Sequence, residues 1–137
     1  MLILKILKKL IFWSKYKIEI DTSRNLILDA LRYYTYRISN LFSDEDDPFQ
    51  PSVIKHNSET FINVVKELIS KIETKDPNQY RNNVSSNYPI ILEAIDLYKS
   101  DIEIAIKHIG DKNMSKIIPV SIKGIPKRID DLRSVLK

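Results

Sequence analysis

The sequence predicts an all-α protein, a compact bundle of four to five helices. Apolar residues recur at i, i+3, i+4 and i+7 in each long segment, which is the spacing of one helix face. Polar stretches that contain proline separate these segments, and proline ends helices. Abundant isoleucine, lysine and asparagine with little alanine or glycine is typical of an AT-rich genome, so the β-branched excess is weak support for strands. One minor β pairing, of residues 17–21 with 116–122, stays open.

The length, cysteine content and charge of the chain limit the classes of protein to which it can belong. The 137 residues fit a single domain, residues 1–137, that can bury its own core. Cysteine is absent, which excludes disulfides and thiolate sites and favours a reducing, cytoplasmic location. The net charge of +4 is modest for a nucleic-acid binder. Residues 1–38 are basic, and residues 39–60 are acidic.

The first element, residues 1–13, reads as an amphipathic helix. Its apolar residues fill one wide face, and Lys5, Lys8 and Lys9 lie opposite with Phe12 among them. The run is too short for a membrane span, and its lysines interrupt it where a signal peptide would be apolar. Three interpretations stay open: the helix covers the domain's own core, lies on a membrane surface, or inserts into a partner's groove.

A second helix is expected over residues 23–42, because the connector 17–21 is followed by candidate capping residues. Tyr34 falls on its apolar face. The opposite side gathers arginines and tyrosines, the residue types of interface hot spots and of base-stacking surfaces. A surface ion pair and half-buried rings would explain the same cluster. The predicted partner-binding residues on this helix are Arg32, Tyr33, Tyr36 and Arg37.

Residues 43–57 are expected to form an acidic, proline-containing loop. Its four consecutive acids complete the predicted partner-binding set: Asp44, Glu45, Asp46 and Asp47. A calcium loop needs a glycine at its sharp turn, and this stretch has none, so no metal site is expected. A solvated loop that meets a basic partner surface is the expectation.

Three further helices follow. Residues 58–75 carry a core stripe, and residues 78–87 are expected to be a loop with a turn of helix. Residues 87–110 form the clearest element, apolar on two sides, which indicates a central position or a covering partner. Residues 111–126 are expected to be an extended connector, and a last helix then docks through Ile125, Ile129, Leu132 and Leu136.

Chemistry-bearing motifs are missing from the sequence. Two isolated glycines cannot build a phosphate-binding loop, and no HExxH, CxxC or GxSxG occurs. Only His56 and His108 could serve as neutral-pH bases, and a half-buried structural role explains His108 more simply. We therefore expect no enzyme, no cofactor and no catalytic residue.

The leading functional hypothesis is a non-enzymatic protein-binding module, an accessory or inhibitory (immunity-type) subunit. No family motif stands out, which is compatible with a phage-related or defence gene. One alternative is an auxiliary nucleic-acid binder, in which the arginine and tyrosine face stacks bases and five cations meet phosphates: Lys112, Lys116, Lys123, Lys127 and Arg128. The other is a peripheral membrane protein that binds through residues 1–13.

Overall fold

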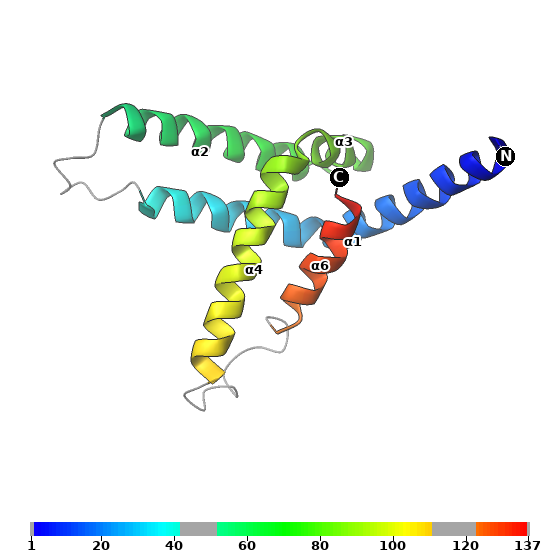
Figure 1. The fold of residues 1–137 in the computed structure, drawn as a ribbon. Helices are drawn as coiled ribbons and strands as arrows, with labels where there is room; N and C mark the ends of the chain where they lie inside the picture. Colours follow the sequence, from blue (N-terminus) through cyan, green and yellow to red (C-terminus); the bar gives the residue numbers. More distant parts are fainter. Residues whose placement is uncertain (1, 42–51, 111–122, 137) are drawn as a thin grey trace.

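The computed structural model describes residues 2–41, 52–110 and 123–136, and the regular structure within these ranges is helical throughout (Figure 1). The predicted all-α bundle is therefore confirmed. The described helices, in chain order, are α1 (Leu2–Leu41), α2 (Ser52–Ile72), α3 (Pro77–Ser86), α4 (Tyr88–Gly110) and α6 (Ile125–Val135).

Helix α1 is the axis on which the others assemble. Its C-terminal part runs beside α2, α4 crosses it, and α3 and α6 pack near its middle (Figure 1). Helix α6 also packs against α4, and α3 packs against the end of α2. The blue N-terminal end of α1 extends beyond all of these contacts (Figure 1).

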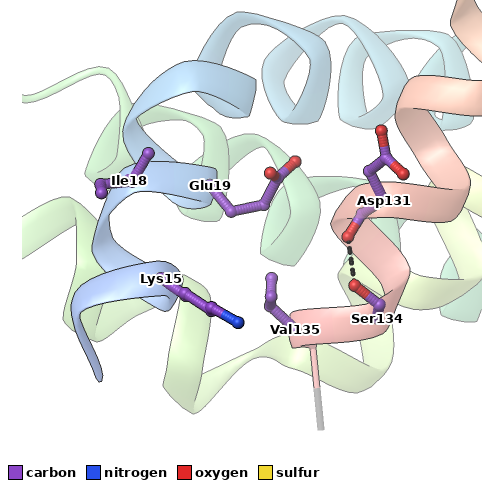
Figure 2. Close-up of a pocket in the computed structure, with 6 residues that line it drawn as sticks. All are labelled: Lys15, Ile18, Glu19, Asp131, Ser134 and Val135. Carbon is purple, nitrogen blue, oxygen red and sulfur yellow. Dashed lines mark hydrogen bonds between the residues drawn. The ribbon is translucent and has the colours of Figure 1, made fainter. Parts of the chain in front are cut away.

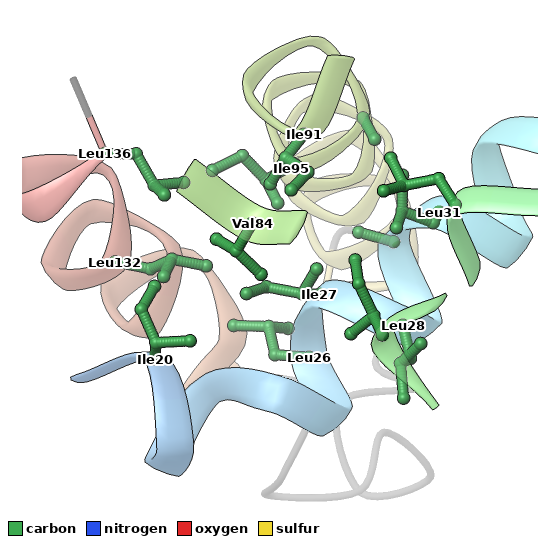
Figure 3. Packing of buried hydrophobic residues seen from close by; sticks show 14 of the residues in the cluster. Ile20, Leu26, Ile27, Leu28, Leu31, Val84, Ile91, Ile95, Leu132 and Leu136 are labelled. Carbon is green, nitrogen blue, oxygen red and sulfur yellow. The ribbon is translucent and has the colours of Figure 1, made fainter. Parts of the chain in front are cut away.

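The core lies where α1, α3, α4 and α6 meet, and α2 closes it along α1 (Figure 3). Every described helix contributes at least one side chain that water cannot reach. Each such aliphatic side chain stabilises the fold by roughly 1.5–3 kcal/mol relative to its exposed state. The fully buried large apolar residues are Ile20, Ile27, Leu31, Val65, Ile72, Val84, Ile91, Ile95, Ile129 and Leu132.

The β pairing predicted for residues 17–21 is wrong, because these residues lie inside α1. Ile20 is fully buried whereas Ile18 is 65% exposed. Residues two apart share a face in a strand but lie about 200° apart around a helix, so this contrast is helical. The other predicted strand, residues 116–122, lies outside the described residues.

The predicted break before residue 23 is also wrong, because its expected capping side chains have other partners. Thr22 donates its hydroxyl to the Ile18 carbonyl at 2.7 Å, and Ser23 donates to the Glu19 carboxylate at 2.9 Å. The Asp21 carboxylate accepts hydrogen bonds from α3. With these side chains committed elsewhere, nothing interrupts the helix, and the two expected helices form one.

The boundaries of α2 and α3 differ from the prediction. Helix α2 begins at Ser52, so residues 52–57 of the expected acidic loop are helical, whereas residues 43–51 lie outside the described residues. Residues 77–86, expected to be mostly loop, form α3. Asp76 caps this helix by accepting the Asn78 amide at 3.0 Å, and Pro77 occupies its first turn, where no amide is needed.

The last two predicted helices are confirmed. Helix α4 has nearly the predicted bounds, although its first half alone is well buried. Helix α6 docks through the expected residues, with Ile129, Leu132 and Leu136 buried and Ile125 packed against the core. Residues 111–122 of the predicted connector lie outside the described residues, and Ile125 already belongs to α6.

Candidate functional site

The feature of the surface that most needs explanation is the N-terminal end of α1. Every side chain described from residue 2 to residue 15 is exposed. Of the three open interpretations, the one in which this helix covers the domain's own core is therefore wrong. The large apolar residues range in exposure from 44% at Trp13 to 75% at Leu2: Leu2, Ile3, Leu4, Ile6, Leu7, Leu10, Ile11, Phe12 and Trp13. We call residues 2–13 the projecting segment.

The phase of the helix explains why the projecting segment leaves the bundle. At about 100° per residue, its apolar residues centre roughly a third of a turn away from the buried residues of α1, such as Ile20, Ile27 and Leu31. In a continuous helix, the centre of the outer stripe therefore points away from the elements that cover the buried stripe. Ile18, exposed beside buried Tyr16 and Ile20, continues the outer stripe along the bundled part of α1.

The polar side of this end of α1 is basic. Lys5, Lys8, Lys9 and Lys15 are its charged residues, and the first acidic side chain is Glu19. Lys17, beyond the projecting segment, lies instead at the angle of Ile6 and Leu10 on the apolar side. This combination of a wide apolar face and a lysine-bearing face makes the segment amphipathic, as the sequence predicts.

Trp13 marks the point where the projecting segment meets the bundle. Its ring stacks on Tyr16, with centroids 5.5 Å apart, and the Lys17 ammonium lies 5.2 Å from the Trp13 ring centroid. Tyr16 is buried, which raises the pKa of its phenol, and its hydroxyl hydrogen-bonds Ser85 of α3 at 2.8 Å. The indole is thus held on a buried neighbour, while the Trp13 residue as a whole stays 44% exposed.

A shallow, open pocket of about 350 Å³ lies beside this junction, between α1 and α6 (Figure 2). Lys15, Ile18 and Glu19 form its α1 side. Val135 and Ser134 belong to the α6 side, where Ser134 donates its hydroxyl to a backbone carbonyl of α6 at 2.6 Å. Side chains of both charge signs line it, so it offers no single-signed ligand site.

The predicted arginine and tyrosine face of α1 is largely used within the bundle. Arg32 pairs with Glu73, the residue directly after α2. Tyr33 donates its hydroxyl to Asp101 of α4, and the Arg37 Nε lies 3.1 Å from the same carboxylate. Tyr33 also packs on the ring of Tyr98, 5.4 Å away between centroids. Arg32 also lies 3.6 Å from Asp29, which is the surface ion pair of the alternative interpretation, but α4 and not the N-terminal part of α1 covers Tyr33.

Tyr36 is the member of that face that points most into solvent, with 61% of the residue exposed. Its ring lies 6.4 Å from that of Tyr33, at a tilt. Tyr34, on the other side of α1, is half-buried at the edge of the core and not inside it as its apolar-face position predicts, and its hydroxyl donates to Glu93 at 2.9 Å. The face therefore offers a partner one free ring and partly engaged guanidiniums.

The remaining predicted residues fall into two groups. Asp44, Glu45, Asp46, Asp47, Lys112 and Lys116 lie outside the described residues. Lys123, Lys127 and Arg128 are exposed around the start of α6, far in sequence from the arginine and tyrosine face.

Of the two histidines, His108 is exposed in the last turn of α4, which corrects its expected half-buried position. His56 lies within α2, and its side chain is outside the described set. Among residues with described side chains, no group of three acidic, histidine or cysteine residues is placed to hold a metal ion.

Sequence reasoning missed a polar cluster that joins α1 to α3. Asp21 accepts hydrogen bonds from Tyr80 and Arg81, and the Tyr80 ring lies 5.0 Å from the Arg24 guanidinium. These bonds, chiefly that from Arg81, lower the pKa of Asp21. The spacing of Tyr80 and Val84, one helical turn apart and both buried, was the available signal for α3.

Known proteins add nothing to these observations. No protein-family model, no curated protein and no solved structure matches this chain. Within the described ranges, no helix has the length and hydrophobicity of a membrane span.

Proposed function

We propose that this protein is a non-enzymatic module that binds a membrane surface through the projecting segment of α1. The observation that carries the proposal is the exposure of nine large apolar side chains on one helix end that leaves the bundle. Contiguous apolar surface of this kind marks sites of interaction with proteins or membranes. A lysine-bearing amphipathic helix is the form that an interfacial membrane helix takes.

The geometry favours a flat surface as the binding partner. The centre of the outer stripe lies roughly a third of a turn from the side on which α1 packs against the bundle, and the projecting segment extends past the other helices (Figure 1). Most of this stripe can therefore meet a membrane without first meeting α2, α4 or α6. Burial of a single leucine or isoleucine side chain contributes roughly 1.5–3 kcal/mol, so a few of these residues suffice for micromolar attachment.

A protein groove is the second candidate, and Phe12 favours it. This residue is 49% exposed and falls on the lysine side of the helix, so the segment is apolar on more than one side. A groove that encloses a helix would bury Phe12 together with the outer stripe. An interfacial position leaves Phe12 in water. This candidate keeps the protein-binding hypothesis, with the projecting segment replacing the arginine and tyrosine face as the main contact.

Vesicle flotation tests the proposal with paired substitutions. Leu7→Gln with Ile11→Gln weakens the outer stripe without changing charge, and both positions are exposed, so the fold is retained. We expect vesicle affinity to fall by roughly a hundredfold. The matched control is Val64→Gln with Ile104→Gln, which removes two exposed apolar residues from α2 and α4 and leaves binding unchanged.

Two results would refute membrane binding. One is that the unaltered chain stays at the bottom of the gradient with every vesicle composition. The other is equal loss of flotation in both pairs of variants, which would mean general surface stickiness. A variant with Phe12→Gln separates the second candidate, because a groove requires Phe12 and a membrane surface does not.

A further inference from the structure

We infer that the membrane surface bound by the projecting segment is anionic, and that lysines along the edges of its apolar face bind lipid phosphates. This inference rests on the proposed function and names its partner. It would not hold for a neutral phosphatidylcholine surface, which the proposed function alone would allow.

The distribution of charge is the first argument. Residues 1–18 carry five lysines and no acidic residue. The chain has 22 basic and 18 acidic side chains in total, so the other residues carry 17 basic and 18 acidic groups. The net positive charge of the protein therefore resides at the end of α1 that bears the exposed apolar face. An anionic leaflet attracts such a segment, whereas the rest of the protein is close to neutral.

The position of the lysines around the helix is the second argument. At about 100° per residue, Lys8 and Lys15 lie within about 40° of Leu4, at one edge of the apolar face. Lys9 lies about 20° from Leu2, at the other edge. A helix lying with its apolar face in the acyl boundary places these two edges at the level of the headgroups. Long lysine side chains reach phosphates from there while their methylene stems cover apolar surface.

The side on which the bundle lies is the third argument. Lys5 is near the middle of the polar side, which is also closer to the buried stripe of α1 represented by Ile20 and Ile27. The bundle is thus carried on the water side of the helix. Trp13, at the edge of the apolar face and stacked on Tyr16, would lie at the interface, where tryptophan is enriched.

Trp13 is the single tryptophan of the chain, so its fluorescence reports on this site alone. The experiment titrates the full chain with two kinds of vesicle, phosphatidylcholine alone and equal parts phosphatidylcholine and phosphatidylglycerol. We expect a blue shift with the anionic vesicles at a lipid concentration where neutral vesicles give little. The midpoint should move to higher lipid as salt is added, because salt screens the attraction.

Two charge-matched variants locate the effect. The first is a triple variant that removes the edge lysines, all of which are exposed: Lys8→Gln, Lys9→Gln and Lys15→Gln. It should bind anionic vesicles about a hundredfold more weakly than the unaltered chain. The second is a triple variant that removes the same amount of charge around the start of α6: Lys123→Gln, Lys127→Gln and Arg128→Gln. Its vesicle titration should match that of the unaltered chain.

The outcomes separate the inference from the proposed function. Equal binding to both kinds of vesicle would overturn the inference and leave membrane binding in place. Equal loss in the two charge variants would overturn it too, because net charge alone would then explain the preference. Binding to neither kind of vesicle would overturn both. The same blue shift with single-stranded RNA and no vesicles would assign the lysines to nucleic acid and overturn the inference.

Discussion

The Arg24 side chain of α1 binds the carbonyl of Ile72, the last residue of α2, with its Nε at 3.0 Å. A second donor of the same guanidinium binds the Thr74 carbonyl at 2.9 Å, and the guanidinium carbon lies 5.0 Å from the centroid of the Tyr80 ring of α3. One side chain thus satisfies carbonyls left free where α2 ends and holds the turn into α3. A lysine has no planar fork and cannot reproduce this arrangement.

We therefore predict that Arg24→Ala lowers the free energy of unfolding by about 2 kcal/mol, because two charge-assisted hydrogen bonds and a cation–π contact are lost. Arg24→Lys should recover less than half of that loss. Urea unfolding followed by circular dichroism measures both. Arg128→Ala, an exposed arginine of α6, is the control and should change the midpoint little. Equal midpoints for Arg24→Ala and Arg128→Ala would contradict the assigned role.

We predict from the Asp21 carboxylate how the stability of the fold changes at acid pH. Its pKa lies below the ordinary value because Arg81 and Tyr80 donate to it. The stabilisation is present above the unfolded-state pKa of about 3.9 and is lost as the pH falls through the lower pKa of the folded state. Asp21→Asn should therefore reduce stability at neutral pH and flatten the loss of stability below about pH 4.

Thermal melts across that acid range compare Asp21→Asn with Asp131→Asn, which removes an exposed carboxylate from α6. The Asp131→Asn protein should retain the acid slope of the unaltered chain. An unchanged slope in Asp21→Asn as well would show that other carboxylates govern acid unfolding.

We predict from the hydrogen bond between Tyr33 and Asp101 that the stability of the fold falls at alkaline pH. Burial and the neighbouring Asp101 carboxylate raise the pKa of Tyr33 from 10.0 to about 12. The folded protein therefore keeps this proton over a range in which the unfolded chain loses it. Stability is fully present below pH 10 and is lost as the pH rises toward 12. Tyr33→Phe should lower stability at pH 8 by about 1 kcal/mol and weaken this alkaline slope.

Tyr34, whose pKa is also raised to about 12, leaves part of the alkaline slope in place in Tyr33→Phe. Denaturant titrations at pH 8 and pH 11 give the comparison, and Tyr88→Phe, with an exposed ring on α4, serves as the control. If Tyr33→Phe retained the full slope, the phenol would not be held by Asp101 in solution.

Helical periodicity was enough to predict the bundle, α4 and α6, because one stripe in each meets the core. It was not enough for α3, where Tyr80 and Val84 are the only buried residues in a polar stretch. Capping propensity misplaced the start of α1, since Asp21 and Ser23 bind side chains instead of free helix amides. Asp21 and Tyr80 bond each other across α1 and α3, a tertiary contact invisible in the sequence, whereas Ser23 bonds Glu19 one turn earlier in the same helix.

The candidate site, too, could be predicted only in part, because its exposure depends on tertiary structure. The sequence gives an apolar face for residues 2–13 but does not say what covers it. That depends on the phase between this face and the buried stripe further along α1, which becomes visible only once residues 17–21 are known to be helical. Likewise, Arg32 and Arg37 read as free cations until Glu73 and Asp101 are placed beside them.

The phase of α1 is open to a direct test with Ile18 and Ile20. Ile20→Ala removes a fully buried side chain and should lower the free energy of unfolding by about 2–5 kcal/mol. Ile18→Ala and Leu10→Ala remove side chains that are 65% and 59% exposed, and each should change it by less than about 0.5 kcal/mol. In a strand, Ile18 and Ile20 would share one face, and their alanine variants would lose similar free energies of unfolding. If the projecting segment folded back on the core, Leu10→Ala would also lower the free energy of unfolding strongly.

Urea titrations of the three alanine variants therefore check the continuity of α1 and the exposure of its end together. A large loss of stability in Ile18→Ala would contradict the continuity of α1. A large loss of stability in Leu10→Ala would contradict the exposure of the projecting segment, and with it the proposal that this segment is free to bind a membrane.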